Sequence, residues 1–84
     1  MRGSKVGYRL DLRDTCLQGA DISELDFIHA LLNKAQMQGA ILSGAQMQGA
    51  DLIGAQMQGA ILLRAQMQGA NLSEAQMQGA IVSR

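Results

Sequence analysis

The chain has 84 residues, which suffices for one small domain, and 48% of them are hydrophobic although it contains one Phe, one Tyr and no Trp. It therefore lacks the bulky side chains of a conventional globular core, and Ala, Leu, Ile and Met must fill a narrow interior. The charges of seven basic and seven acidic side chains cancel, so the formal net charge is zero. This balance gives no reason to expect nucleic acid or a membrane as a partner, and no apolar run is long enough to span a bilayer.

The first nine residues lie outside the repeat that follows. The opening Met1-Arg2-Gly3-Ser4 has no apolar stretch behind its charge, so it does not resemble a secretory signal, and it is typical of a start added by an expression vector. We therefore expect residues 1–9 to be a vector-derived leader and partial N-terminal cap. The single cysteine, Cys16, cannot form an internal disulfide, and together with the missing signal peptide it predicts a cytoplasmic location.

From residue 10 onward the chain repeats with a period of five. The 75 residues from Leu10 to Arg84 form fifteen units without insertion. The middle residue of every unit is apolar: Leu12, Leu17, Ile22, Phe27, Leu32, Met37, Leu42, Met47, Leu52, Met57, Leu62, Met67, Leu72, Met77 and Val82. Two positions earlier stands a small or apolar residue, which is Ala in every unit from Ala30 to Ala80. A period of five fits neither a helix nor a strand, and it indicates a solenoid of stacked units.

The units change in character along the chain. Those in residues 10–34 are diverse, whereas from Ala35 onward the sequence Ala-Gln-Met-Gln-Gly-Ala recurs every ten residues, with variable units between the copies. Eight units end in Gly, which suits turns that require a permissive backbone.

The pattern Ala-[Asp/Asn]-Leu-x-x, seen at Ala20-Asp21-Ile22, Ala50-Asp51-Leu52 and Ala70-Asn71-Leu72, resembles that of the pentapeptide-repeat family, and the resemblance covers 75 of the 84 residues. It implies an all-β fold, a right-handed quadrilateral parallel β-helix with four units to a coil. Residues 10–84 would then form one domain of just under four coils. The middle residue and the residue two before it would point inward. The chain departs from the family pattern with Met at five middle positions and with Gln or Ile at many sites usually held by Asp or Asn.

With four units to a coil, residues twenty apart lie on one face. Two opposite faces then carry columns of Gln, which can bond to one another along the stack and form a neutral surface. A third face presents an apolar stripe, which is our candidate interaction surface because exposed apolar patches tend to mark contacts. Its members are Ile41, Ile61, Leu63, Ile81 and Val82. The alternative explanation is that β-branched residues favour strand positions even in solvent.

No group of residues predicts catalysis, a cofactor or a metal. His29 is the only histidine and is expected at a solvent-facing corner, and Cys16 is expected to face outward, so neither has partners for metal binding or a dyad. Three acids, Asp21, Glu24 and Asp26, lie close together, but general acid–base catalysis needs a cleft, which a gapless prism does not offer. The methionines are adaptable core residues. We therefore expect no enzyme.

The sequence favours a non-enzymatic structural or protein-interaction module, a short rod that is either whole or a segment of a longer protein, and that binds a protein partner or itself. Family resemblance leaves two alternatives, a gyrase-binding DNA mimic and the repeat segment of a secreted effector. The mimic requires a strongly acidic rod, and the last fifty residues hold only Asp51 and Glu74 against Arg64 and Arg84. We expect a homodimer formed through the C-terminal coil around residues 75–84, as the resemblance implies, with the isoleucine stripe as a second contact.

Overall fold

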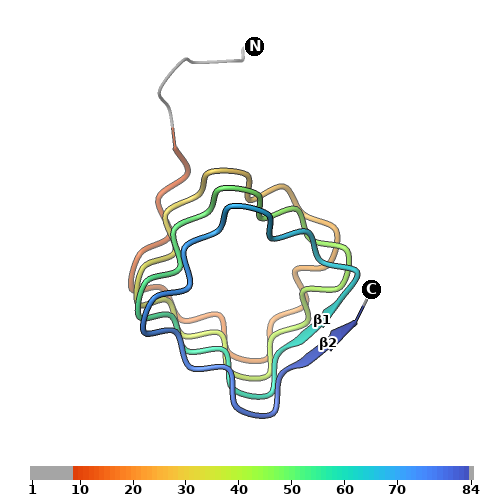
Figure 1. Ribbon diagram of the computed structural model, residues 1–84. Helices are drawn as coiled ribbons and strands as arrows, with labels where there is room; N and C mark the ends of the chain where they lie inside the picture. Colours follow the sequence, from red (N-terminus) through yellow and green to blue (C-terminus); the bar gives the residue numbers. More distant parts are fainter. Residues whose placement is uncertain (1–8, 84) are drawn as a thin grey trace.

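The chain winds into a stack of square coils, with one pentapeptide unit on each side of the square (Figure 1). The computed structural model describes residues 9–83, so most of the leader expected at residues 1–9 lies outside the described part. Parallel bridges join residues twenty apart, from Asp11↔Leu31 at the start to Gln56↔Gln76 near the end. One pair is extended enough to form regular strands, β1 (Ile61–Leu63) and β2 (Ile81–Ser83), in the same register.

Within each unit, the five positions have fixed hydrogen-bonding roles, which we number so that the middle apolar residue is third. The N–H groups of the third and fifth residues donate to the following coil, as Leu32 does to the Asp51 carbonyl (2.8 Å) and Lys34 to the Ile53 carbonyl (3.0 Å). The N–H of the second residue donates to the preceding coil, as Leu31 does to Leu10 (2.8 Å). The ladder therefore satisfies most of the backbone polar groups that the coils bury.

A tight turn ends each unit, and it explains the glycines. The first residue of the next unit donates to the third residue's carbonyl, as Ala35 does to Leu32 at 3.0 Å, which places the fifth residue at the third position of a four-residue turn. All eight glycines expected at turns have φ between +68° and +75°. Only this residue of the turn has positive φ, which is typical of a type II turn.

Six other units complete the same turn without glycine. Their fifth residues have φ between +59° and +62° and are Asp14, Glu24, His29, Lys34, Arg64 and Glu74. L-residues tolerate this region at a cost of roughly 1–2 kcal/mol each. The square coil therefore imposes the left-handed conformation on whatever residue occupies the corner.

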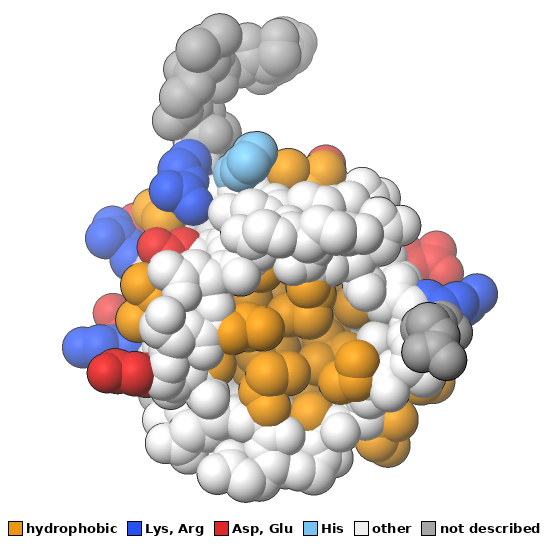
Figure 2. All heavy atoms as spheres, viewed as in Figure 1, with side chains coloured by type: hydrophobic (Ala, Val, Ile, Leu, Met, Phe, Trp, Pro, Cys, Tyr) orange, Lys and Arg blue, Asp and Glu red, His pale blue; other side chains and the backbone are white. Residues whose placement is uncertain are grey.

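The core is a single narrow column of first- and third-position side chains. Alanine fills the first position from Ala30 to Ala60, with no more than 1% of each residue exposed, and Met57 is fully buried as the sequence predicts. The column is less covered toward the last coil, where Leu72 is 37% and Val82 64% exposed. Figure 2 shows hydrophobic side chains filling the centre of the stack.

Candidate interaction surface

The five residues of the candidate surface lie in or beside the strand pair β1–β2. Ile41, Ile61 and Ile81 are bridged in sequence, so they form one continuous column at the second position of three successive coils. Ile41 and Ile61 are half-buried by their neighbours, whereas Ile81 is 52% and Leu63 38% exposed. We call these four residues the isoleucine face. Its exposed apolar area is concentrated in the last two coils.

Val82 belongs to a different surface from the isoleucine face. It occupies a third position, whose side chain points into the lumen, and it is 64% exposed because no described coil covers it. The sequence analysis includes Val82 in the candidate surface, although its middle position already predicts an inward side chain. The structure separates the side of the rod from its end.

Within each Gln face, side chains of successive coils are joined by hydrogen bonds. Gln38 donates from Nε2 to Oε1 of Gln56 (2.6 Å), and Gln58 donates in the same way to Gln76 (2.7 Å). On the opposite face Gln48 donates to Gln66 (2.8 Å). These bonds join residues eighteen apart, so they cross from the fourth position of one coil to the second position of the next. The bonding between Gln side chains follows a diagonal, and it uses amide groups that would otherwise be free for a partner.

Asp and Asn at the second position have a structural role. Asp51 accepts a hydrogen bond from the backbone N–H of Ile53 in its own unit (3.4 Å), and Asn71 accepts one from Ser73 (3.0 Å). The described units with Asp or Asn at this position all form this bond, while those with Gln, Ile, Leu or Cys form none. The sequence showed which second positions hold Gln or Ile in place of Asp or Asn. The structure adds that these units lack the hydrogen bond from the fourth-position backbone N–H to the second side chain.

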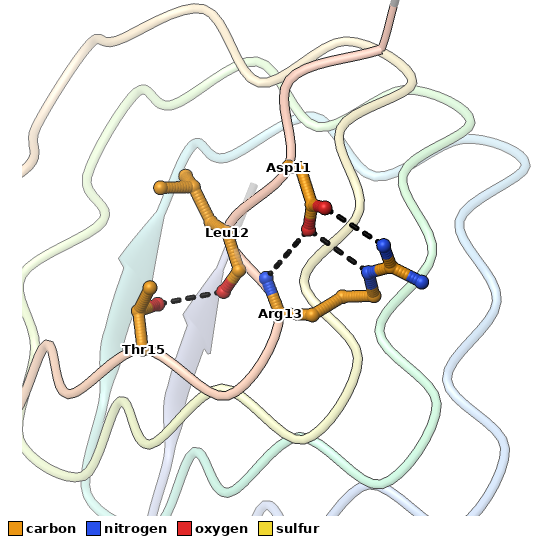
Figure 3. A network of polar contacts seen from close by, with 4 residues as sticks. All are labelled: Asp11, Leu12, Arg13 and Thr15. Atoms are coloured by element: carbon orange, nitrogen blue, oxygen red, sulfur yellow. Dashed lines mark hydrogen bonds and ion pairs between the residues drawn. The ribbon is translucent and has the colours of Figure 1, made fainter.

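The strongest polar contact lies on the first coil (Figure 3). The Asp11 carboxylate accepts bonds from Arg13 Nε (2.9 Å) and from its terminal nitrogen (2.7 Å), and also from the Arg13 backbone N–H (3.1 Å). Side-chain hydrogen bonding with Arg13 is the largest cause that lowers the pKa of Asp11 to about 2. The hydrogen bond from the Ser23 hydroxyl similarly lowers the pKa of Asp21. Both sets of hydrogen bonds are exposed, and each fixes the local conformation of its own unit.

The remaining candidate residues do not converge on a site. Cys16 and His29 are both exposed, and no three His, Cys, Asp or Glu side chains among residues 9–83 are grouped as metal ligands would be. The His29 imidazole lies instead against Gly49 of the following coil. The part of the chain that the structure describes also contains no helix able to cross a bilayer.

Comparison with known proteins identifies the family. The profile described as pentapeptide repeats matches residues 20–59 and 45–84, in eight copies, so the chain belongs to the pentapeptide-repeat family. Proteins of this family adopt a right-handed quadrilateral β-helix and are generally structural or interaction proteins. The resemblance drawn from the sequence is therefore confirmed. No curated protein matches the chain.

Two solved structures of cyanobacterial pentapeptide repeat proteins are similar to this chain. One, from Cyanothece, is 34% identical, with 88% of this chain and 50% of that chain covered and a TM-score of 0.42. The other is HetL from Nostoc, a protein involved in the regulation of heterocyst differentiation, which is 35% identical, with 93% of this chain and 43% of that chain covered and a TM-score of 0.39. The chain thus spans about half the length of these two relatives.

Proposed function

We propose that the chain is a non-enzymatic protein-interaction module, a β-helical rod of just under four coils that binds a protein partner or a second copy through the isoleucine face. The observation that carries this proposal is the column Ile41–Ile61–Ile81 with Leu63 beside it, on a rod whose two adjoining faces are lined with Gln. Apolar side chains gathered on one side of a small rod favour burial against another protein.

Charge supports this proposal over a DNA mimic. Five of the seven acids lie in residues 10–29, whereas the rest of the described rod has Asp51 and Glu74 against Lys34 and Arg64. A gyrase-binding mimic would need negative charge along its length to imitate a phosphate backbone. The neutral Gln faces offer none.

For this chain alone, the simplest partner is a second copy, with the two isoleucine faces side by side in a homodimer. Sedimentation velocity at tens of micromolar tests the proposal with Ile61→Asp, which places a charge at the centre of the face. The control is Gln66→Asp, which changes a second-position residue on the next side of the same coil. We expect Ile61→Asp to have a lower mean mass than the control. Equal masses for the two variants would contradict the isoleucine face as the contact.

A further inference from the structure

Two opposite charges lie along one edge of the isoleucine face. The fifth-position residues of its units in three successive coils are Glu24, Gly44 and Arg64, which stack because the ladder joins residues twenty apart. We call this column of three corners the charged edge. Glu24 and Arg64 are both exposed, and among residues 9–83 neither takes part in an ion pair. The charged edge is therefore acidic on one side of Gly44 and basic on the other.

The Glu24 side chain reaches the level of the second coil. A Cβ on Gly44 would lie 3.0 Å from Cγ of Glu24 and 3.7 Å from its Oε2, so the side chain lies across the glycine corner. Arg64 stands one coil further along the axis, a spacing of about 4.8 Å. A carboxylate and a guanidinium are thus presented at neighbouring levels of the same edge.

The other edge of the isoleucine face carries no charge. Its corners are the fifth-position residues of the preceding units, and all four are glycine: Gly19, Gly39, Gly59 and Gly79. The two edges of the face are therefore different, so the face has a direction across the strands as well as along the axis.

We propose that two copies pair through their isoleucine faces with their axes antiparallel, and that Glu24 and Arg64 select this arrangement. The two-fold axis runs along the strands, midway between the coils of Ile41 and Ile61. The inference rests on the proposed function, because it needs the isoleucine face as the contact. It adds the relative orientation of the two copies and the two residues that determine it.

In this arrangement the charged edges of the two copies meet with the order of their coils reversed. Arg64 of each copy lies against the Gly44 corner of the second copy, which is the corner that the Glu24 carboxylate crosses. The four charges then alternate in sign, and each guanidinium lies between two carboxylates. An alternating network of this kind favours association more than one isolated exposed pair does.

The apolar residues of the two faces are compatible with the same register. Ile41 of each copy faces Ile61 of the second copy at the centre of the contact, and Leu63 faces the small Ser43. Asp21 lies at the rim, opposite Ile81, where its carboxylate stays hydrated and accepts a hydrogen bond from the Ser23 hydroxyl (2.6 Å). The apolar centre is thus surrounded by polar groups, as in most protein interfaces.

Charge opposes the two simplest alternative arrangements. If the axes were parallel, the charged edge of each copy would meet the glycine edge of the other, and Glu24 and Arg64 would have no partner. If the antiparallel copies slid by one coil, so that Ile61 faced Ile61, then Arg64 would lie against Arg64 and the two would repel. Only the proposed register pairs opposite charges while it keeps isoleucines at the centre.

Charge reversal at the two residues tests the proposal. Glu24→Arg makes the charged edge wholly basic, and Arg64→Glu makes it wholly acidic. Each variant alone brings like charges together at two places in the dimer, whereas an equimolar mixture of the two pairs opposite charges at both places. Both residues already have positive φ at exposed corners, so neither substitution requires a new backbone conformation.

The matched controls are Glu74→Arg and Lys34→Glu. They change the net charge by the same amounts, at exposed corners with the same positive φ, but on the edge of the rod diagonally opposite the charged edge. Lys34 even lies against Gly54 as Glu24 lies against Gly44. Any association that comes from net charge alone therefore affects the controls equally.

Sedimentation equilibrium over a range of concentrations measures the dimer. We expect Glu24→Arg and Arg64→Glu each to raise the dissociation constant about tenfold above that of its control, and the mixture to return it to the value of the parent chain. These differences should shrink in about 1 M salt, because exposed charges are then screened. Glu24→Lys and Arg64→Asp replace any variant that does not fold by circular dichroism.

Two results would overturn the antiparallel pairing and leave the isoleucine face as the contact, provided that Ile61→Asp is monomeric. One is that the charge-reversed variants dimerise as tightly as their controls. The other is that mixing the two controls gives an equal gain, since net charge would then explain the association. If Ile61→Asp dimerises as tightly as Gln66→Asp, or the parent chain is monomeric at tens of micromolar, the homodimer through this face is wrong as well.

Discussion

A Cβ atom on Gly49 would lie 2.5 Å from Nδ1 of His29, because the imidazole of one coil lies across the glycine corner of the next. At Gly39 a Cβ would meet nothing within 4 Å, although φ is almost the same, +69° against +70°. An alanine at Gly39 would therefore cost only the free energy of the left-handed backbone, whereas an alanine at Gly49 would add the free energy of the contact with His29.

We predict that Gly39→Ala lowers the free energy of unfolding by about 1–2 kcal/mol, the cost of a left-handed L-residue, and that Gly49→Ala lowers it further. Thermal and urea unfolding measure both changes. Removing the imidazole with His29→Gly should abolish the excess in the double variant. If the two alanine variants unfold alike, the imidazole does not press on this corner.

The hydrogen bond from the fourth-position backbone N–H to a second-position side-chain oxygen can be introduced into a unit that lacks it. Gln46→Asn places an acceptor beside the N–H of Gln48, in the arrangement of Asn71 and Ser73, and Gln46 makes no side-chain hydrogen bond that would be lost. We expect a gain of about 0.5–1.5 kcal/mol, visible as a melting temperature several degrees higher. Gln46→Leu, which supplies no acceptor, is the control and should show no such gain.

Burial decreases along one interior column, and it predicts that the same substitution lowers the free energy of unfolding less toward the last coil. Met57 is fully buried and Met77, twenty residues later, is only partly covered. Met57→Ala should cost about 2–5 kcal/mol, and Met77→Ala clearly less, because the cavity at Met77 opens to solvent. Met57→Lys should unfold the stack, since its charge has no partner in the lumen. Unfolding by urea, followed by circular dichroism, distinguishes these outcomes, and equal costs at the two methionines would contradict the packing.

The Asp11–Arg13 pair predicts a specific acid response. Its carboxyl has a pKa of about 2 in the folded chain against an ordinary 3.8, so its contribution to stability is present above about pH 4 and is lost as the pH falls toward 2. Because the pair is exposed, the effect on global stability is small. An NMR titration of the Asp11 carboxyl should show the low pKa, and Arg13→Ala should return it toward 3.8 while leaving Asp21 unchanged.

The five-residue period predicted a solenoid of stacked units, and the resemblance to the pentapeptide-repeat family supplied the square coil and the inward side of each unit. Small first residues and apolar third residues fit so narrow a lumen. Met57 and Ala60 are buried where the sequence placed them. The diagonal bond from Gln38 to Gln56 was not predictable, because it depends on how one coil is offset from the next. The left-handed corners at Lys34 and Arg64 were equally hidden, since these residues show no preference for positive φ.

The decads have a further consequence that follows from their length. Two of them span one coil, and each presents the same Ala-Gln-Met-Gln-Gly segment half a turn from the last. Loss or duplication of two decads would therefore shorten or lengthen the rod by one rise of about 4.8 Å and leave the register of the remaining columns unchanged. Unequal recombination between repeated gene segments produces such changes. A lineage that carries this repeat can therefore vary the length of the rod while the geometry of each coil stays the same.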